Sequence, residues 1–367
     1  MSNLFFRTNI APYRIDTYNA LHEQLGCEMY FYWKEETSQK LDMVTMLQQC
    51  KFTPQYLKGI RLFANSRKLC TSIWSILRKN KPEVVIVPEF QILTIQVLLY
   101  KWLFRKKFKV ISMCDDSYDM LTNDNDFSFI HKYARKIIAP KLDEILLVDN
   151  RSAEWYKKNY GKGIWLPIIR DEQKEIPLYK EALDISKKLN IQYNLAGKKV
   201  LLFVGRLVDV KNLNRMIEAI GKTQEDFVTV IVGDGIKLEE LKEEASKTGK
   251  EIIFAGHFEN QEIRAWYNIS DVMILPSTRE AFGAVTNEAL IAGNYCLISK
   301  SAGSSCLINE SNGKVIDPYN IEEMAKDIDD IFNKKVTIKN KDLILKGNKM
   351  AFDFKSTMSK VFNQIKL

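Results

Sequence analysis

Short apolar runs recur along the chain, each followed by a polar loop and then by residues with helical spacing. In the first half these runs lie at 4–6, 29–33, 84–87, 109–113, 144–148 and 164–166. In the second half they lie at 200–204, 228–232, 252–254, 272–275 and 296–298. Continuous apolar runs of this length are typical of strands buried on both faces of a parallel sheet. Strands that alternate with helices predict an α/β protein.

The length of 367 residues allows two α/β domains, each with its own core. The segment 171–198 is polar, contains Pro177 and has one amphipathic stretch, so we interpret it as a linker. We therefore predict a first domain at residues 1–170 and a second at 199–340. The remaining tail, 341–367, carries apolar residues at helical spacing, and we expect it to form a helix that packs back towards the first domain.

The stretch 276–293, PSTREAFGAVTNEALIAG, joins a predicted strand to a predicted helix. Glu280 lies in the loop and Glu288 in the helix, roughly 8–12 Å away at about 1.5 Å rise per residue. Gly283 lets the backbone approach a ligand closely, and the N–H groups that start the helix at Ala284 attract an anion. Two such acids could hold the ends of an elongated ligand with an anionic centre, such as a nucleoside diphosphate sugar. Two solvated surface glutamates remain the alternative.

Basic residues and glycines follow other strands of the second half. Arg206 and Lys211 come after the strand 200–204, at a carboxyl edge where a diphosphate could meet both cations. Plain surface charges explain these two residues equally well. Gly233 and Gly235 bracket an acid after the next strand, which suits a tight turn but is a weak signal alone. The small-residue loop 301–305 follows a further strand near the same edge.

In the first half, polar residues follow two predicted strands. Asn9, Tyr13 and Arg14 lie in the loop and helix start after the first strand, and Asp115 and Asp116 follow the strand 109–113. Both places are carboxyl ends of strands, where open parallel sheets bind ligands. A functional site and simple helix capping by aspartate or serine explain the acidic loop equally well.

Only the first half of the chain carries an excess of positive charge. The formal net charge is +8, and residues 1–170 hold 26 Lys and Arg against 17 Asp and Glu, whereas the remainder holds 28 against 29. A basic half predicts an anionic partner, either a membrane surface or a phosphorylated substrate. Nucleic acid is disfavoured, because no nucleic-acid-binding module is recognisable. Residues 92–109 join apolar and aromatic residues to a basic cluster, which suits a membrane contact or a core helix with a solvated basic end.

Cysteines and histidines indicate neither a disulfide framework nor a metal site. The six cysteines form no CxxC pair and have no metal-ligand spacing with the three histidines. They are typical of reduced thiols, and the chain start lacks the apolar run of a secretory signal. Polar residues interrupt the most apolar stretch, 84–104, so no membrane span is expected. We expect a cytoplasmic protein, with peripheral attachment to the inner face of the membrane left open.

Five motifs of the second half resemble, in order, those of retaining GT-B glycosyltransferases of the glycosyl transferases group 1 kind, family 4. They are VGRLVDVKN, IVGDG, AGHFENQEIRAWYNISDVMILPS, REAFGAVTNEALIAG and SAGSS, and they lie within residues 200–317. In the first half only NIAPYRIDTYNAL is similar, in outline, to an acceptor-side loop and helix. The resemblance implies two Rossmann-like domains facing each other across a cleft, with a nucleotide sugar held by the second.

The resemblance also implies roles for single residues. Arg206 and Lys211 would neutralise the diphosphate and stabilise the leaving nucleotide. Glu280 would bind hydroxyls of the donor sugar and Glu288 those of the ribose. The donor-binding set would comprise Gly205, Phe258, Phe282, Gly283, Ala284, Val285 and Glu288, with Phe258 bordering the base. Cations and helix-start amides would meet the developing phosphate charge, so neither a metal nor a cofactor is expected.

The chain departs from the family pattern in its first half. The loop 9–12 has no glycine, and Cys114, Asp115 and Asp116 stand where many relatives carry a histidine. The donor and the first-domain site residues therefore stay open.

We expect a metal-independent retaining hexosyltransferase that moves a sugar from a nucleotide donor to a glycan. A UDP-sugar is favoured over GDP-mannose, and a lipid-linked surface polysaccharide intermediate is the expected acceptor. The alternatives are a non-catalytic GT-B protein that binds nucleotide or glycan, and a nucleotide-sugar epimerase on the same fold. A dehydrogenase is disfavoured because neither first strand-to-helix turn carries GxGxxG.

Overall fold

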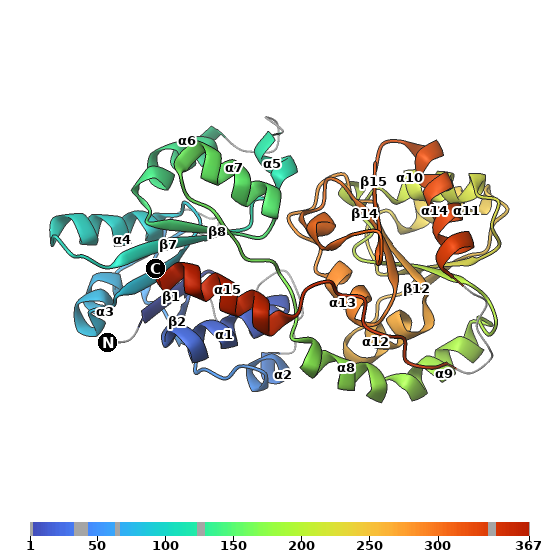
Figure 1. The fold of residues 1–367 in the computed structure, drawn as a ribbon, viewed down its shortest axis with the longest axis horizontal. Helices are drawn as coiled ribbons and strands as arrows, with labels where there is room; N and C mark the ends of the chain where they lie inside the picture. The colour runs from blue at the N-terminus through green and yellow to red at the C-terminus, as the bar shows by residue number, and fades with distance from the viewer. Residues whose placement is uncertain (1–2, 33–42, 63–66, 123–128, 337–342, 367) are drawn as a thin grey trace. The chain divides into compact units, whose positions relative to one another are not determined.

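The computed structural model describes residues 3–32, 43–62, 67–122, 129–336 and 343–366. The chain divides into two compact units, one of residues 1–169 with 355–367 and the other of residues 170–354. Each unit is an α/β domain built on a parallel sheet (Figure 1). The predicted fold class of two Rossmann-like domains is therefore confirmed.

The first unit contains a seven-stranded parallel sheet in the order β3-β2-β1-β6-β7-β8-β9. Its strands are β1 (Asn3–Arg7), β2 (Cys27–Phe31), β3 (Gln55–Tyr56), β6 (Val84–Pro88), β7 (Lys109–Cys114), β8 (Glu144–Leu147) and β9 (Ile164–Trp165). Trp33, at the end of a predicted strand, lies outside the described residues. Strand order reverses between β1 and β6, and a crevice at such a point, beyond the carboxyl ends, is the usual ligand site of this architecture.

The helices of this unit cover both faces of the sheet. They are η1 (Pro12–Arg14), α1 (Ile15–Leu25), α2 (Met43–Gln48), α3 (Ile73–Asn80), α4 (Ile92–Leu103), α5 (Tyr118–Thr122), α6 (Phe129–Ile138), η2 (Ala139–Lys141), α7 (Asn150–Tyr160) and α15 (Phe354–Lys366). Alternate residues of β1 point to opposite faces, as the strand period requires. Phe6 joins a core with Leu93 and Tyr156, whereas the Phe5 ring lies 5.2 Å from that of Tyr18.

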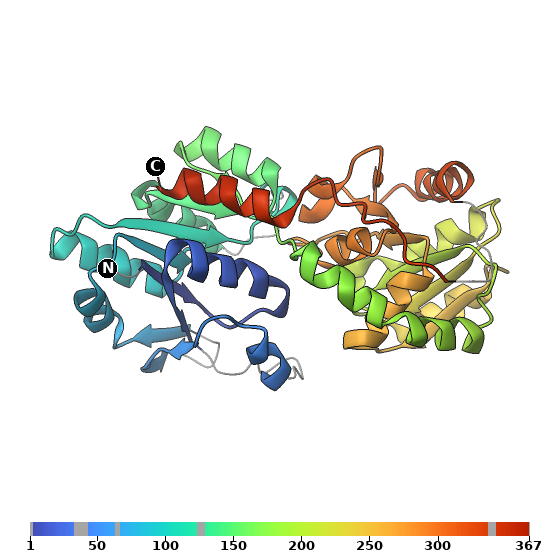
Figure 2. The same cartoon turned by 60° about the horizontal axis from the view of Figure 1, so that its bottom comes forward.

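The C-terminal helix α15 belongs to the first unit. It lies beside α1 in both Figure 1 and Figure 2. Met358 and Phe362 are buried, and Lys109 Nζ donates a hydrogen bond to the Ile365 carbonyl oxygen at 3.3 Å. The apolar spacing in the tail therefore serves core packing. A short antiparallel hairpin, β4 (Gly59–Leu62) and β5 (Arg67–Cys70), was not predicted.

The second unit contains a six-stranded parallel sheet in the order β12-β11-β10-β13-β14-β15. Its strands are β10 (Val200–Val204), β11 (Val228–Val232), β12 (Ile252–Gly256), β13 (Val272–Leu275), β14 (Tyr295–Ser299) and β15 (Gly313–Ile316). Only β15 was not predicted, because Lys314 interrupts its apolar pattern. In this order the carboxyl ends of β11, β10, β13 and β14 are neighbours.

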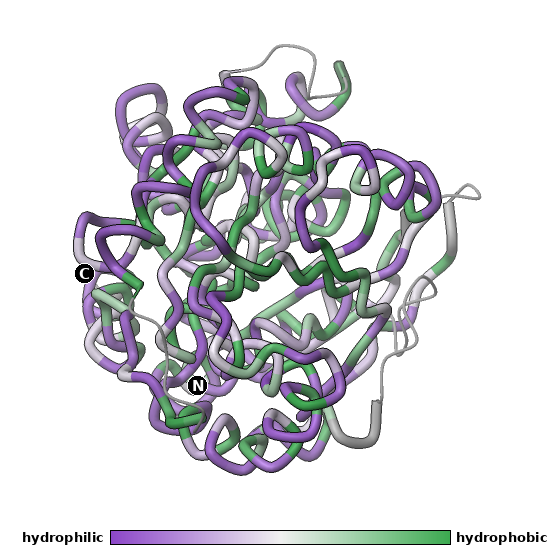
Figure 3. The backbone as a smooth tube through the Cα atoms, turned by 90° about the vertical axis from the view of Figure 1, so that its right-hand side faces the viewer, coloured by the Kyte–Doolittle hydropathy of each residue, from purple (hydrophilic) through white to green (hydrophobic). Residues whose placement is uncertain are grey.

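The helices around this sheet are amphipathic. They are α8 (Glu172–Glu181), α9 (Leu183–Gln192), η3 (Asp209–Lys211), α10 (Leu213–Lys222), α11 (Leu238–Ser246), α12 (Asn260–Ile269), α13 (Val285–Ile291), η4 (Gly303–Leu307) and α14 (Ile321–Lys335). Hydrophobic and hydrophilic segments alternate along the helical turns of the tube in Figure 3. α10, for example, buries Leu213, Met216, Ile217 and Ile220.

The segment 171–198 is packed structure rather than a free linker. It forms α8 and α9, which lie against α12 within the second unit. Asn268 Nδ2 donates hydrogen bonds to the Tyr179 carbonyl oxygen at 2.7 Å and to Ser186 Oγ at 3.2 Å. These buried polar contacts fix both helices to the domain, because a buried amide without partners would be costly. The polar composition that suggested a linker belongs to the exposed faces of these helices.

Candidate functional site

The loops at the carboxyl edge of the second sheet touch one another through their backbones. Gly205 N donates a hydrogen bond to the Val232 carbonyl oxygen at 3.0 Å. A Cβ on Gly233 would lie 1.9 Å from the carbonyl oxygen of Gly205, and one on Gly303 would lie 2.3 Å from that of Ala281. Only glycine allows these approaches. These contacts join the loop after β10 to the loop after β11, and the loop after β13 to the loop after β14.

Lys211 and Glu280 form an ion pair at this edge. Lys211 Nζ donates a hydrogen bond to Glu280 Oε2, and the two side chains are 14% and 20% exposed. The backbone of Glu280 is held by a parallel bridge to Ala302, and Thr278 N donates to the Val210 carbonyl oxygen at 2.9 Å. Arg206 comes between β10 and Lys211 in the chain and is exposed. The edge thus presents two cations for an anion and one carboxylate for hydroxyl groups.

The loop between Glu280 and α13 has the tight backbone that its glycine predicts. Gly283 has φ of +93°, and a Cβ there would lie 2.5 Å from Leu275 Cδ2. Phe282 is buried and anchors the loop, whereas Ala284 and Val285 are half-buried. Thr286 N and Asn287 N, in the first helical turn, already donate to the carbonyl oxygens of Gly283 and Ala284. These two helix-start amides therefore already have hydrogen-bond partners within the protein.

Glu288 lies in the first turn of α13 among aromatic side chains. Tyr267 Oη donates a hydrogen bond to Glu288 Oε2 at 3.0 Å, and Tyr179 Oη donates to the Glu288 carbonyl oxygen at 3.0 Å. Burial raises the pKa of Glu288, although Arg170 and the Tyr267 hydrogen bond oppose the rise. The carboxyl group is half-buried, so it can also meet a ligand hydroxyl.

Three charged residues near Glu288 escaped the sequence analysis. Glu175, which is buried, forms ion pairs with Arg170 and with Arg264, the latter at 3.1 Å. Arg170 N also donates to Asn287 Oδ1 at 2.7 Å, which ties this network to α13. Arg264 and Glu175 are 89 positions apart in the chain. Local pattern carries no signal of such a contact.

Phe258 follows β12 at the same edge. Its ring packs against Trp266 with a centroid distance of 5.7 Å, and it is half-buried. His257 is exposed and shares a hydrogen bond with Glu259 at 3.0 Å. Phe258 thus offers an apolar ring face at the rim, while His257 is a surface residue.

The first unit has a charged cluster at the carboxyl ends of β1 and β7. Asp115 accepts hydrogen bonds from Arg7 at 2.6 Å and from Arg14 at 2.5 Å, and Arg14 is only 1% exposed. Arg7 NH1 also donates to the Met113 carbonyl oxygen at 2.7 Å. Burial alone would raise the pKa of Asp115, but the two guanidinium groups outweigh it and lower the pKa.

The other predicted site residues of this unit differ in how far they are buried. Asp116 is 3% exposed and accepts a hydrogen bond from Tyr156 Oη at 2.9 Å, which places it in the interior. Asn9 is half-buried after β1, and Tyr13 in η1 is exposed. The structure thus brings Arg14 and Asp115 together. Asp116 lies apart from this pair, because its side chain is buried and bonds to Tyr156 instead.

Glu89 is a further residue of this edge that sequence reasoning missed. It follows β6 directly and has φ of +31°, a rare conformation for a residue with a side chain. Thr94 Oγ1 and Ser112 Oγ donate to its carbonyl oxygen at 3.0 and 3.1 Å and hold this geometry. Burial, reinforced by the charge of Asp115, raises the pKa of Glu89 to about 7. The sequence feature that could have identified Glu89 is its position as an acid directly after a buried strand.

Metal-ligand groups and membrane spans were sought in the described parts of the chain. No group of three or more His, Cys, Asp or Glu side chains there could hold a metal ion. No helix among these residues is long and apolar enough to cross a membrane. The six cysteines are free thiols, and four of them are buried.

Comparison with known proteins shows the fold of the whole chain and a family to which part of the chain is similar. The whole chain superposes on Anabaena HepE in complex with UDP, with a TM-score of 0.75, 16% identity and full coverage of both chains. It superposes on the apo form of the lipopolysaccharide outer core galactosyltransferase WaaB with a TM-score of 0.69, 18% identity and full coverage of both. The protein therefore has the GT-B fold. The model of the family described as "Glycosyl transferases group 1" matches residues 185–350, so this part of the chain is similar to that family.

The sequence relatives are matched over part of their length. An uncharacterised glycosyltransferase of Methanocaldococcus jannaschii is 28% identical over 160 residues, 42% of this chain and 40% of the relative. The 2-deoxystreptamine glucosyltransferase of Streptomyces kanamyceticus is 28% identical over 142 residues, 36% of each chain. The matches thus span less than half the length of these relatives.

Proposed function

We propose that the protein is a retaining glycosyltransferase of the hexosyltransferase type, which uses a nucleotide diphosphate sugar as donor and needs no metal ion. The observation that carries the proposal is the carboxyl edge of the second sheet. There the Lys211–Glu280 pair and exposed Arg206 lie in loops shaped by close glycine contacts, and the Tyr267–Glu288 hydrogen bond joins α12 to α13. This edge falls within the region that the family model matches.

Each group of this edge has a chemical task in the proposed reaction. Arg206 and Lys211 meet the diphosphate, Glu280 accepts hydrogen bonds from the sugar hydroxyls, and Glu288 accepts them from the ribose. The bond between the anomeric carbon and the phosphate oxygen breaks, and its electron pair leaves with the nucleotide. Lys211 and Arg206 stabilise this charge as it develops. Phe258 borders the base.

The sugar then forms a new bond to an acceptor oxygen on the face that the nucleotide leaves. The acceptor hydroxyl proton passes to the departing phosphate oxygen, so the atoms and charges balance without a nucleophilic carboxylate. Asn9, Tyr13 and Asp115 at the carboxyl edge of the first sheet are the proposed acceptor residues, and buried Arg14 holds Asp115 in place. The buried Arg7–Asp115–Arg14 network holds this edge rigid.

A UDP-sugar is the proposed donor and a lipid-linked glycan the proposed acceptor. HepE has been solved with UDP and with UDP-glucose, and WaaB is described as a lipopolysaccharide outer core galactosyltransferase. A relative from Bacillus subtilis is described as a putative teichuronic acid biosynthesis glycosyltransferase. These neighbours support a role in surface polysaccharide assembly, with the protein in the cytoplasm at the inner face of the membrane.

The test is a thermal-shift screen against UDP, GDP, ADP and their sugar conjugates, without metal and again with Mg²⁺. A ligand at about 100 times its Kd adds about 2.7 kcal/mol of stability. We expect UDP or one UDP-sugar to stabilise the wild type, and Glu288→Ala and Arg206→Ala to lose the shift. Lys242→Ala, a charge removal on the exposed face of α11, is the matched control and keeps it.

Turnover then separates the proposed enzyme from its rivals. Release of UDP that depends on a glycan acceptor supports the transferase. Nucleotide binding without turnover would favour a non-catalytic protein, and loss of donor without acceptor would favour an epimerase. The donor site is rejected if no nucleotide stabilises the protein at millimolar concentration.

A further inference from the structure

Helices α4 and α6 of the first unit leave a large apolar surface uncovered. They flank a cavity of about 1140 Å³, here named the α4–α6 groove. Trp102 on α4 is 74% exposed, and Phe129 and Tyr133 on α6 are 81% and 59% exposed. The rings of Phe129 and Tyr133 stack with a centroid distance of 6.2 Å. A contiguous exposed patch of this kind marks an interaction surface, whereas single exposed apolar residues do not.

Core packing does not account for these side chains. α4 already covers the sheet with Leu93, Val97 and Tyr100, which are buried. Trp102 and Leu99, with Ile130 on α6, lie on the opposite side of their helices and are exposed. The sequence left a core helix and a membrane contact as alternatives for residues 92–109. In the structure, one face of α4 packs in the core. The other face is exposed, and the exposed residues of α6 continue it.

Positive charge surrounds the groove. Arg105, Lys106 and Lys141 line it and are exposed, and no carboxylate is among the described residues that line it. Lys101 also lines it but is paired with Asp143 at 2.7 Å. Apolar and aromatic side chains framed by Lys and Arg are the composition of surfaces that bind the headgroup region of anionic bilayers.

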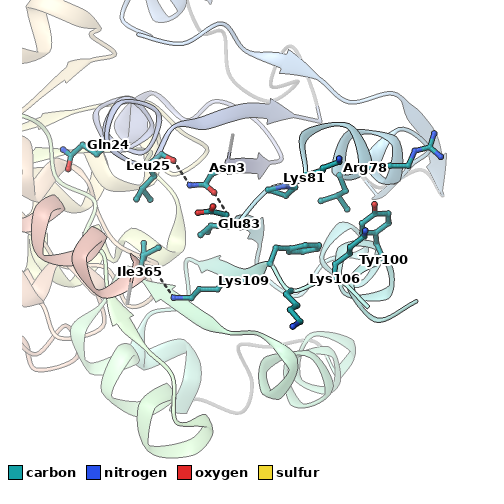
Figure 4. A pocket seen from close by; sticks show the side chains of 15 residues that line it. Asn3, Gln24, Leu25, Arg78, Lys81, Glu83, Tyr100, Lys106, Lys109 and Ile365 are labelled. Atoms are coloured by element: carbon teal, nitrogen blue, oxygen red, sulfur yellow. Dashed lines mark hydrogen bonds between the residues drawn. The ribbon is translucent and has the colours of Figure 1, made fainter. Parts of the chain in front are cut away.

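A second cavity, here named the basic pocket, adjoins the groove through Lys106. It has a volume of about 800 Å³, and Figure 4 shows its lining side chains. Among the described residues that line it, the cations are Arg78, Lys81, Lys106, Lys107 and Lys109, and the one acid is Glu83. Asn3 closes one side by donating to the Leu25 carbonyl oxygen at 2.6 Å and accepting from Val84 N at 2.9 Å.

The basic pocket lies at the edge of the sheet that the proposed reaction does not use. Asn3, Val84 and Lys109 begin β1, β6 and β7, whereas the charged cluster of Asp115 lies at the carboxyl ends of these strands. Ligands of open parallel sheets bind at the carboxyl edge. The positive charge at the amino edge therefore needs a separate explanation, and a lipid phosphate supplies one.

We infer that the α4–α6 groove and the basic pocket dock the first unit onto an anionic lipid bilayer. Trp102, Phe129 and Tyr133 enter the headgroup region, where amphipathic aromatic rings are favoured. The pocket and the groove rim contact lipid phosphates. A second copy of the chain is a poor occupant, because a twofold contact would set the same cations against each other.

The inference rests on the proposed function for the lipid-linked acceptor, but vesicle binding is measured with neither donor nor acceptor. The full-length protein is sedimented with vesicles of phosphatidylcholine alone and of phosphatidylcholine with phosphatidylglycerol. We expect binding to the anionic vesicles only, weakened by added salt. Loss of one basic residue weakens such binding about fivefold.

Two variants test the two parts of the surface. Trp102→Ser with Phe129→Ser removes exposed rings, and Arg105→Glu with Lys106→Glu reverses charges; both are expected to lower vesicle binding more than tenfold. Trp102→Phe should keep it. Ile236→Ser, at an 87% exposed residue of the second unit, and Lys242→Glu with Lys247→Glu are matched controls expected to bind as the wild type does. An unchanged UDP-induced thermal shift, or an unchanged unfolding transition, shows that each variant is folded.

The outcomes are distinct. Equal vesicle binding by wild type and both groove variants, or no binding by the wild type, overturns the inference. Stabilisation by inorganic phosphate without vesicle binding would assign the basic pocket to a soluble anion and also overturn it. Failure of the nucleotide screen with intact vesicle binding would reject the proposed donor site while leaving the docking surface in place.

Discussion

The two units share one architecture but organise their carboxyl edges differently. In the second unit, close glycine contacts join neighbouring loops, and half-buried pairs such as Lys211–Glu280 are open to a ligand. In the first unit, the edge holds a buried network in which Asp115 joins Arg7 and Arg14. The second edge suits a ligand that replaces one partner of a pair. The first suits a preorganised surface, because Asp115 already pairs with two guanidinium groups.

The two edges also differ in how far apart in the chain their contacting residues lie. The second edge is built from short motifs, each at the end of one strand. The first depends on contacts between residues 101 to 108 positions apart. Its net positive charge lies elsewhere, at the α4–α6 groove and the basic pocket. The first unit thus combines a rigid edge with a charged exterior, and the second concentrates its chemistry at one edge.

The largest expected effect is on the buried network. Asp115→Asn leaves Arg14 buried without a charge partner, and we expect a loss of about 3–5 kcal/mol in the free energy of unfolding. Urea denaturation followed by circular dichroism measures it. Glu23→Gln is the matched control, since the Lys51–Glu23 pair is exposed on both sides and should contribute less than about 1 kcal/mol. Equal losses of unfolding free energy in the two variants would show that the buried network stabilises the fold no more than an exposed ion pair does.

Next is the pH dependence caused by Glu89. Its pKa is raised to about 7 in the folded protein against an ordinary value of 4.5, so the folded state binds the proton more tightly. The stabilisation is full below pH 4.5 and is lost as the pH rises through 7, by up to about 3 kcal/mol. Glu89→Gln should flatten this part of the profile. Thermal unfolding of both proteins from pH 4.5 to 8 measures it, and an unchanged slope would count against the raised pKa.

Glycine substitution probes the close approach in the second unit. Gly233→Ala places a Cβ against the Gly205 carbonyl oxygen, and we expect a cost of about 2–3 kcal/mol together with weaker nucleotide binding. Gly249→Ala is the control, because φ there is +69° but no atom lies within 4 Å. Strain alone should then cost about 1 kcal/mol. Denaturation and nucleotide titration compare them, and similar costs would show that the contact does not matter.

The smallest expected effect concerns the Glu288 carboxyl group. Tyr267→Phe removes the hydroxyl that donates to Oε2, and a hydrogen bond of about 1 kcal/mol corresponds to about fivefold weaker nucleotide binding. Tyr319→Phe, at an exposed ring beside Arg215, should bind as the wild type does. Isothermal titration measures both. If Tyr267→Phe binds UDP normally, Glu288 does not depend on this tyrosine for its position.

Much of the fold followed from the sequence, because strand periodicity and glycine position are local properties. The strands β10, β11 and β13 begin and end where the apolar runs predicted. Arg206, Lys211 and Glu280 were predicted to follow strand ends, and the structure joins the loops of Lys211 and Glu280 through their ion pair and the hydrogen bond from Thr278 N to the Val210 carbonyl oxygen.

The tertiary structure alone decided which distant residues meet. Strand order placed Glu89 beside the Asp115 cluster, and the packing of α8 on α12 joined Glu175 to Arg264. The α4–α6 groove arises because two helices separated in sequence expose apolar faces to the same hollow. Local spacing determines what a segment becomes, because backbone hydrogen bonds and side-chain period act over a few residues. Topology determines which charges and apolar faces come together, because those contacts form only when the sheets are assembled.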